Sequence, residues 1–516
     1  MKLKPFRNEP INNFSNKKVY QAQVDALKKV AKQFGKTHEL VINGKKLRSK
    51  KKFNSYNPSN KKEVIGVFYK ADKNLADRAV REAAKVFETW KNTPAETRSK
   101  YLLKAAEIVR KRRFEINAWM IYEAGKNFVE ADADTAEAID FLEFYARENL
   151  RYSAKQPVTK VKGEKNELFY IPLGVHVVVP PWNFPFAILV GMTSAAIVTG
   201  NTVVLKPSSD TPMMGKLFFD IMKEAGLPDG VLNYVTGSGG EVGDTLVAHP
   251  LTRAIAFTGS VGVGQHIYEL AAKVQPGQIW LKRVIAEMGG KDAIIVDSEA
   301  DIDAAVQGVV ASAFGFQGQK CSACSRAIVD AKVYTEFNKK LKAEVEKIEV
   351  GPAKDNYRMG PVINAAAQAN ILSYIEIGKK EGKLVTGGKK IEGDGYYIEP
   401  TIIKDVKPTA KIAQEEIFGP VLAVIKAKDF DHALKIANNT MYGLTGSVYS
   451  KNRKKLERAR KEFHVGNLYF NRKSTGALVG GHPFGGFNMS GTDSKAGGRD
   501  YLLLFLQAKS VSEKIQ

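Results

Sequence analysis

The feature that most constrains the fold is a regular alternation of short β-rich runs with turns and helices in the middle of the chain. From Gly174 onward, four such runs are each followed by a turn and a helical segment. They are Val175 to Val179, Thr202 to Leu205, Val231 to Val235 and Ala254 to Phe257. Strands that alternate with helices in this way form a parallel sheet covered on both faces. The sequence therefore predicts an α/β fold.

A second series of the same kind follows the Gly-Gly pair at 289–290. Its expected strands lie near Ala293 to Val296, Ser325 to Val329, Val421 to Ile425 and Thr445 to Val448. Before both series, Asp72 to Leu150 carries Ala, Leu and Ile at helical spacing, which predicts packed amphipathic helices. We expect Arg151 to Gly163 and Leu502 to Val511 to be extended segments outside both sheets.

Composition places the chain among globular intracellular proteins. With 516 residues, 44% of them apolar, it is long enough for two or three domains with sizeable cores. The N-terminus lacks the apolar core of a secretion signal, and the longest apolar run, Phe186 to Val198, is too short to span a bilayer. The 2 cysteines do not form a disulfide scaffold, and the 7 histidines show no metal-binding spacing. We expect a cytoplasmic protein with no metal site.

The formal net charge of +23 allows two interpretations. The run from Lys45 to Lys52 is a candidate patch for nucleic acid or an anionic membrane. However, lysines are spread along the whole chain, and no aromatic-interleaved binding module accompanies this run. We therefore expect a lysine-rich solvated surface, with no specific nucleic-acid partner and no membrane partner.

Three polar residues lie next to predicted turns or at a predicted strand end, positions that are common for catalytic groups. Cys321 follows two glycine-bearing turns, Glu287 ends an apolar run before a Gly-Gly break, and Asn183 lies in a proline-flanked turn. A thiol is a nucleophile, a carboxylate at a strand end is a general base, and an amide can hold an oxyanion. Together they indicate acyl chemistry through a thioester.

Two other interpretations of Cys321 remain open at this point. A cysteine is often a small buried hydrophobe. Cys321 and Cys324 also form a C-x-x-C, which can be a redox dithiol or half of a zinc site. There is no second cysteine pair to complete a zinc site, and a dithiol leaves Glu287 and Asn183 unexplained.

These blocks, with Phe-Thr-Gly-Ser at 257–260 and Glu-Glu-Ile-Phe-Gly-Pro at 415–420, resemble the aldehyde dehydrogenase superfamily from about Val41 to the C-terminus. The resemblance implies a Rossmann-type cofactor domain, an α/β catalytic domain and a small β flap for oligomerisation. The expected bounds are 1–150 and 168–288 for the NAD(P)-binding domain, 289–489 for the catalytic domain, and 151–167 and 490–516 for the oligomerisation segments. A homo-oligomer is therefore expected.

The cofactor implied by the resemblance is NAD. Gly259 to Gly264 joins a strand to a helix, where backbone N–H groups can meet a pyrophosphate. Ser209 stands where strictly NAD-preferring relatives commonly have glutamate, so NADP is expected to be usable as well. The expected cofactor-binding residues are Pro181, Trp182, Lys206, Ser209, Gly259, Ser260, Val263, Glu416 and Phe418.

The resemblance also assigns the catalytic roles. Cys321 attacks the aldehyde, Asn183 and the Cys321 backbone N–H hold the oxyanion, and Glu287 activates water to hydrolyse the thioester. We expect Lys320 and the cationic nicotinamide to lower the pKa of the thiol.

Segments around Cys321 and near the C-terminus narrow the range of possible substrates. Segments 320–326, 474–480, 483–487 and 490–497 are similar to those of the delta-1-pyrroline-5-carboxylate dehydrogenase family. This implies oxidation of L-glutamate γ-semialdehyde to L-glutamate in proline degradation. The expected substrate-binding residues are Glu137, Phe184, Ser322, Gly476, Ala477 and Phe484. The alternatives are a related dehydrogenase for another carboxylated semialdehyde, or a nucleic-acid-binding protein on a retired dehydrogenase fold; the intact Cys321, Glu287, Asn183 and Lys206 argue against the latter.

Overall fold

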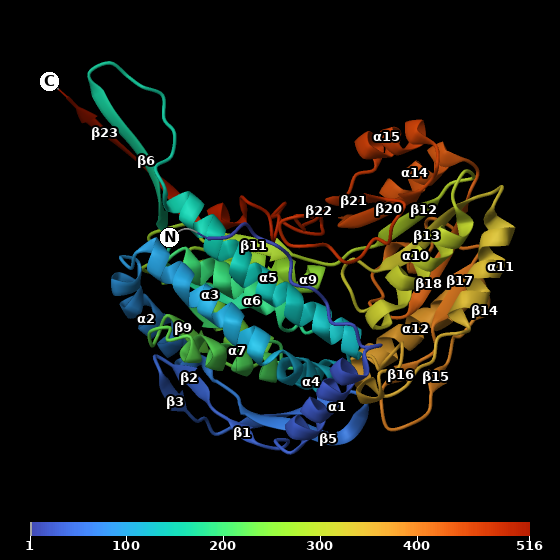
Figure 1. The fold of residues 1–516 in the computed structure, drawn as a ribbon, viewed down its shortest axis with the longest axis horizontal. Helices are drawn as coiled ribbons and strands as arrows, with labels where there is room; N and C mark the ends of the chain where they lie inside the picture. Colours follow the sequence, from blue (N-terminus) through green and yellow to red (C-terminus); the bar gives the residue numbers. More distant parts are fainter. Residues whose placement is uncertain (1–2, 516) are drawn as a thin grey trace.

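Two large sheets form the centres of two lobes that lie side by side (Figure 1). The computed structural model describes residues 3–515. The N-terminal half of the chain, blue to green, builds the first lobe, and most of the C-terminal half, yellow to red, builds the second (Figure 1). The predicted α/β fold class is confirmed.

The first lobe contains a seven-stranded sheet. In sheet order its strands are β11 (Arg283–Glu287), β10 (Thr252–Thr258), β7 (Val175–Val179), β8 (Thr202–Leu205), β9 (Leu232–Tyr234), β2 (Leu40–Ile42) and β3 (Lys45–Leu47). The strands from β11 to β9 are parallel, and β2 and β3 form an antiparallel edge. The four strands predicted for the first series are confirmed, whereas the edge strands had not been predicted.

Helices cover both faces of this sheet. They are α1 (Lys17–Ala31), α2 (Lys73–Trp90), α3 (Ala95–Lys111), α4 (Arg113–Ala124), α5 (Phe128–Ser153), α6 (Ala187–Val198), α7 (Pro212–Glu224), α8 (Asp244–Ala248) and α9 (Val261–Ala272). Side chains alternate between the faces of a strand, so Val178 belongs to the core under α3 to α7, while Val175 and Val177 belong to the core under α2, α8 and α9. The predicted helical packing layer over 72–150 is confirmed.

The second lobe repeats this plan. In sheet order its strands are β14 (Lys383–Thr386), β17 (Thr401–Lys404), β18 (Val421–Ala427), β13 (Cys324–Asp330), β12 (Asp292–Val296), β20 (Thr445–Tyr449) and β21 (Asn467–Phe470). All neighbours except β14 and β17 are parallel. Its helices are α10 (Ile302–Phe314), α11 (Tyr334–Val345), α12 (Ala365–Glu381), α13 (Lys411–Gln414), α14 (Phe430–Asn438) and α15 (Arg453–Glu462). The four strands predicted for this series are confirmed.

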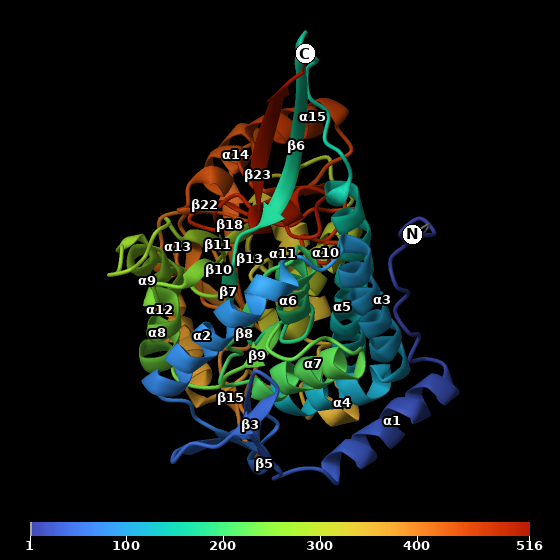
Figure 2. The ribbon, with the colours of Figure 1, turned by 90° about the vertical axis from the view of Figure 1, so that its left-hand side faces the viewer.

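Small sheets complete the molecule. They pair β1 (Thr37–His38) and β4 (Lys52–Asn57) with β5 (Asn60–Tyr69), β15 (Lys390–Ile391) with β16 (Tyr397–Ile398), β19 (Tyr442–Gly443) with β22 (Phe487–Asn488), and β6 (Glu164–Pro172) with β23 (Leu506–Lys514). The β6–β23 ribbon projects away from the first lobe (Figures 1 and 2). No helix within residues 3–515 combines the length and apolar composition that a membrane span requires.

The extended segments differ from the prediction at their starts. Residues 151–153 continue α5, where Arg151 pairs with Glu148 one turn earlier, and residues 501–505 form a 3-10 turn. The strand β6 begins only at Glu164 and continues to Pro172 because β23 pairs with it over its whole length. The other domain bounds remain our proposal.

Candidate active site

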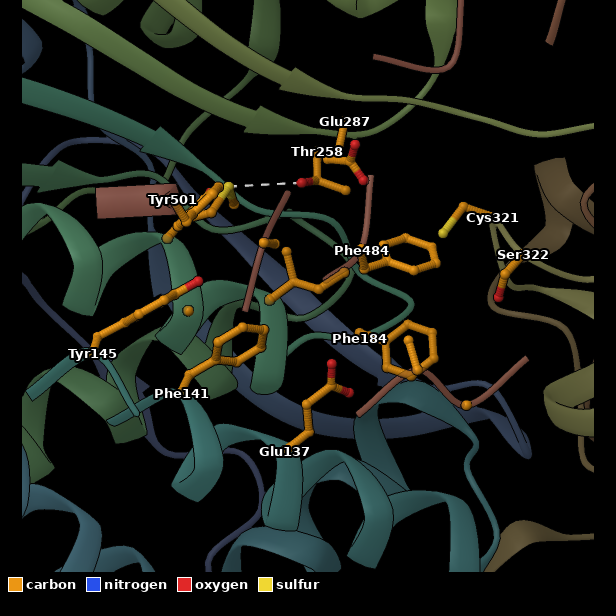
Figure 3. A pocket seen from close by; sticks show the side chains of 16 residues that line it. Glu137, Phe141, Tyr145, Phe184, Thr258, Glu287, Cys321, Ser322, Phe484 and Tyr501 are labelled. Carbon is orange, nitrogen blue, oxygen red and sulfur yellow. Dashed lines mark hydrogen bonds between the residues drawn. The ribbon is translucent and has the colours of Figure 1, made fainter. Parts of the chain in front are cut away.

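A pocket between the lobes brings together residues from both. Its volume is about 110 Å³. Its lining residues are Glu137, Phe141, Tyr145, Phe184, Ile188, Gly191, Met192, Thr258, Glu287, Cys321, Ser322, Gly476, Ala477, Phe484, Ala496 and Tyr501. Two of the three predicted catalytic residues and all six predicted substrate-binding residues are therefore in one cavity (Figure 3).

Cys321 is held by an unusual loop. Phe316, Gln317 and Gly318 have consecutive positive φ values of 49°, 57° and 68°. Residues other than glycine rarely have a positive φ. Such backbone strain persists only where the surrounding structure imposes it. The buried Gln317 side chain supplies part of this restraint, because its Nε2 donates to the carbonyls of Gly125 at 3.2 Å and Pro361 at 2.7 Å. Cys321 therefore lies on a fixed loop.

Asn183 lies beside the same loop, although it does not line the pocket. It is buried after the carboxyl end of β7, and its Nδ2 donates to the carbonyl of Gln319 at 3.0 Å. A side-chain amide carries two N–H bonds, so one remains for a substrate oxygen. The amide is thus tied to the backbone two residues before Cys321.

Glu287 ends β11 and points into the pocket from the first lobe (Figure 3). Its Oε1 accepts the Gly486 N–H at 3.2 Å. Burial raises the pKa of its carboxyl to about 8, and the Gly486 N–H and Lys495 oppose the rise. A carboxyl with a pKa near neutrality is suited to move protons.

The predicted effect of Lys320 on the thiol is wrong. Its ammonium pairs with Glu130, with a closest nitrogen–oxygen distance of 2.9 Å. Burial, and then the charge of Glu287, raise the pKa of the Cys321 thiol well above its ordinary value. Lys320 is therefore committed to another partner.

Cys324 has a different environment from Cys321. It is buried in the core of the second lobe, and its Sγ donates to the carbonyl of Arg326 at 3.5 Å. Both cysteines are free thiols. The C-x-x-C therefore contains one thiol in the pocket and one in the core, an arrangement that does not favour a redox dithiol.

The substrate-binding candidates line the pocket from several elements. Glu137 projects from α5, a helix that begins where the Asn127 side chain accepts the Glu130 N–H at 3.0 Å. Figure 3 shows the rings of Phe184 and Phe484 between Glu137 at one end and Glu287 at the other. Burial first, and then Asp134, raise the pKa of the Glu137 carboxyl to about 8.

The backbone conformation at position 476 favours glycine. Its φ is +77°, and a Cβ there would lie 3.3 Å from the Lys473 side chain. Gly476 and Ala477 both line the pocket, and the absence of a side chain at 476 lets a ligand approach the backbone closely.

Eight lining residues were not predicted. They are Phe141, Tyr145, Ile188, Gly191, Met192, Thr258, Ala496 and Tyr501. A helical repeat was a usable signal for two of them, because Phe141 and Tyr145 follow Glu137 at steps of four on α5. Tyr501 precedes the ribbon strand β23, and no local pattern links it to the pocket.

Seven of the nine cofactor candidates follow the carboxyl ends of parallel strands of the first lobe, where α/β folds bind nucleotides, and Glu416 and Phe418 come from the second lobe, between α13 and β18. Lys206 follows β8; it is buried, and burial lowers the pKa of its ammonium to about 8. Within residues 3–515 this ammonium has no hydrogen-bond or ion-pair partner. A buried, unpaired cation needs an acceptor from elsewhere, which a ribose hydroxyl can supply.

The turn from β10 to α9 offers unpaired donors. Ser260 precedes α9 and makes no side-chain cap, and Gly262 has open space around its Cα. Free N–H groups at the start of a helix suit a pyrophosphate. Val263, in the first turn of α9, and Ser209, which follows β8, are both exposed.

Glu416 is the residue expected at the nicotinamide end of the cofactor. Its Oε1 accepts the Gly290 N–H at 3.1 Å, and burial raises the pKa of its carboxyl to about 7. A Cβ on Gly289 would lie 2.1 Å from its Oε2, so this glycine makes room for the carboxylate. Trp182, after Pro181, packs edge-on against Phe418 at 5.4 Å between ring centroids. These residues fit a bound dinucleotide.

Comparison with known proteins decides the family. The model of the aldehyde dehydrogenase family matches residues 46–511. The chain belongs to the aldehyde dehydrogenase family. It is 59% identical over 512 residues to the 1-pyrroline-5-carboxylate dehydrogenase of Geobacillus thermodenitrificans, covering 99% of each chain.

Members of the family with solved structures show the same fold. A 1-pyrroline-5-carboxylate dehydrogenase from Thermus with bound NAD is 54% identical, with a TM-score of 0.98 and all of both chains covered. The betaine aldehyde dehydrogenase of Staphylococcus aureus in complex with NAD⁺ is 29% identical, with a TM-score of 0.89, 96% of this chain covered and 97% of that one. These two relatives with the same fold thus have NAD bound, and NAD is the cofactor expected for this chain.

Proposed function

We propose that the enzyme oxidises L-glutamate γ-semialdehyde, the open form of 1-pyrroline-5-carboxylate, to L-glutamate with NAD, as the second step of proline degradation. The observation that carries the proposal is the composition of one pocket, which has Cys321 and Glu287 near one end and Glu137 at the other. A related dehydrogenase for another carboxylated semialdehyde is the alternative. The 59% identity to a 1-pyrroline-5-carboxylate dehydrogenase favours the first.

The reaction follows from the positions of three side chains. The Cys321 thiol loses its proton to water, its sulfur forms a bond to the aldehyde carbon, and the carbonyl oxygen becomes an oxyanion held by Asn183 and the Cys321 N–H. NAD held by Lys206, Glu416 and Phe418 would supply the hydride acceptor for this carbon. A thioester between the Cys321 sulfur and the acyl carbon remains. Glu287 takes a proton from water, whose oxygen then displaces the sulfur and gives the carboxylate product.

The pocket lining offers groups for both charges of an α-amino acid. Ser322 can donate its hydroxyl, and Gly476 and Ala477 their N–H groups, to the α-carboxylate. The Glu137 carboxylate can pair with the α-ammonium, which would favour its ionised form. Phe184 and Phe484 lie between Glu137 and the Cys321 thiol, where an aliphatic stem would pass, and Ser322 lies beside Cys321 (Figure 3).

The experiment that tests the function compares NADH formation from pyrroline-5-carboxylate, succinate semialdehyde and propanal. We expect kcat/KM for the first to exceed that for propanal by about 10³-fold or more, because a site built for polar groups discriminates against substrates that lack them. Equal values for all three would remove the substrate assignment. A preference for succinate semialdehyde would favour the alternative.

Replacing Glu137 with glutamine should weaken recognition of the α-ammonium. We expect the ratio of kcat/KM for pyrroline-5-carboxylate to that for propanal to fall by about 10- to 100-fold, since a charged hydrogen bond contributes about 1.5–3 kcal/mol. The matched control is Asp140→Asn, one turn further along α5, where the carboxylate meets Asn8 and the Glu9 N–H outside the pocket. Steady-state kinetics that give the same ratio for Glu137→Gln and the wild type would contradict this role.

Introducing glutamate at Ser209 should strengthen the preference for NAD. A carboxylate at this exposed position would repel a 2′-phosphate, and we expect the NAD-to-NADP ratio of kcat/KM to rise about tenfold, equivalent to about 1.4 kcal/mol. Ser209→Gln, of similar size but uncharged, is the control. An unchanged ratio in Ser209→Glu would place the 2′-phosphate elsewhere.

We also propose a homo-oligomeric, cytoplasmic enzyme. The antiparallel β6–β23 ribbon projects from its own lobe, so its strands are available for contact with a second copy of the chain (Figure 2). Two free cysteines suit a reducing compartment. A monomeric mass by light scattering would contradict the assembly.

A further inference from the structure

A fully buried lysine lies behind the active site. Lys126 connects α4 to α5, and its side chain is 0% exposed. Its Nζ is 2.9 Å from Oδ2 of Asp134, which is equally buried. The ammonium also lies over two aromatic rings, 4.0 Å from the centroid of Phe184 and 4.5 Å from that of Phe316. One cation therefore contacts three side chains in the interior.

The two rings belong to the two loops that carry the chemistry. Phe184 directly follows Asn183, and Phe316 begins the run of positive φ values that leads to Cys321. The ammonium thus bridges the loop of the amide and the loop of the nucleophile, contacting each through an aromatic face.

Neighbouring hydrogen bonds connect the same three segments. Oδ1 of Asp134 accepts the Ala187 N–H at 2.6 Å, which fixes the start of α6 after the Asn183 turn. The carbonyl of Gly125, next to Lys126, accepts from Gln317 in the nucleophile loop. The connection between α4 and α5 is therefore joined to both loops.

Stability alone gives no reason for this arrangement. Removing two charges from water costs several kcal/mol per ion, and apolar replacements of buried ion pairs are often neutral or stabilising. A role in positioning the loops of Asn183 and Cys321 therefore accounts for this buried ion pair better than a role in folding.

We propose that Lys126 is a positioning residue that keeps the Asn183 amide and the Cys321 thiol in register around one carbonyl group. It touches neither substrate nor cofactor; it acts through Phe184, Phe316 and Asp134. The inference rests on the proposed thioester chemistry, but not on the identity of the aldehyde.

The test compares Lys126→Met, Lys126→Arg and the wild type. Two rates are measured: NADH formation from pyrroline-5-carboxylate or propanal, and hydrolysis of p-nitrophenyl acetate, which needs the thiol and the oxyanion donors but no hydride transfer. A displacement of about 1 Å between reacting groups costs about 10²-fold in rate. We expect Lys126→Met to lower kcat of both reactions about 10- to 100-fold with KM nearly unchanged. Lys126→Arg should recover much of the loss, because a guanidinium also stacks on aromatic rings.

Lys455→Met is the matched control. Lys455 also pairs with a buried aspartate, Asp297, at 2.7 Å, and also lies over an aromatic ring, Phe430, at 5.7 Å, but it is outside the pocket. We expect wild-type rates from it. Thermal unfolding of every variant separates loss of fold from loss of register.

The outcomes are distinct. A folded Lys126→Met enzyme with wild-type kcat in both reactions would overturn the proposal, as would equal losses in Lys455→Met. If Lys126→Met does not fold, Phe316→Leu removes one of the two bridged rings; it should lower kcat, and an unchanged kcat would overturn the proposal. Should the wild type hydrolyse the ester but reject glutamate semialdehyde, the proposed substrate fails while the comparison of Lys126 variants remains valid.

Discussion

Replacing Cys321 with alanine is expected to lower NADH formation by about 10⁴-fold or more. Removal of a catalytic nucleophile has effects of this size because the covalent route is lost entirely. No other thiol can replace it, since the only other cysteine in the sequence, Cys324, is buried in the core of the second lobe. Stopped-flow fluorescence of NADH in a single turnover measures the effect without interference from product release.

The control for this prediction is Cys324→Ala. We expect it to cost about 1 kcal/mol of stability, as the loss of a small buried group does, and to keep most of the activity. Turnover of Cys321→Ala within tenfold of the wild type would contradict the mechanism. A loss in Cys324→Ala as large as that in Cys321→Ala would instead show that the second thiol takes part.

Eight central strands of the two sheets were predictable from the sequence because they are largely buried, whereas β14, β17 and β21 were missed as well as β2 and β3, and only the end of β11, at Glu287, was predicted. Buried strands appear as short apolar runs, as in Val175–Val179, and the helices between them force a parallel arrangement. Edge strands lack this signal. The strand β3 reads Lys-Lys-Leu, and only its pairing with β2 makes it a strand.

The candidate site was predictable where chemistry is tied to short motifs. Cys321, Glu287 and Asn183 stand out because a thiol, a carboxylate and an amide each adjoin a Gly or Pro turn. The walls contributed by α5 and α6 were not found, since apolar residues such as Phe141 look like ordinary core from the sequence alone.

Electrostatic partners were the least predictable part. Lys320 is adjacent to Cys321 in sequence, but its ammonium meets Glu130, which is 190 residues away. Lys126 reads as a surface lysine between two helices, yet the fold places it under two rings. Burial and long-range pairing decide such roles, and neither is encoded locally.

Glu287→Gln is expected to separate the two halves of the reaction. Glutamine keeps an oxygen that can accept the Gly486 N–H but cannot take a proton from water. The first half should still yield about one NADH per active site. The steady rate should then fall by about 10²- to 10⁴-fold, as the loss of a general base predicts, and the thioester should accumulate on Cys321. Rapid-quench kinetics with intact-protein mass spectrometry measures the burst and the bound acyl group together.

The pH dependence gives an independent check on the same residue. Since burial raises the pKa of Glu287 to about 8, the carboxyl is mostly protonated at pH 7 and accepts protons only as the pH rises through about 8. Hydrolysis of the thioester in the wild type should therefore rise about tenfold per pH unit below that value and level off above it, whereas Glu287→Gln should lack this step. Glu123→Gln is the matched control, because burial also raises the pKa of Glu123 to about 8 but its carboxyl meets Ser55 and the Met213 N–H outside the pocket. If the step near pH 8 survives in Glu287→Gln or disappears in Glu123→Gln, the base is not Glu287.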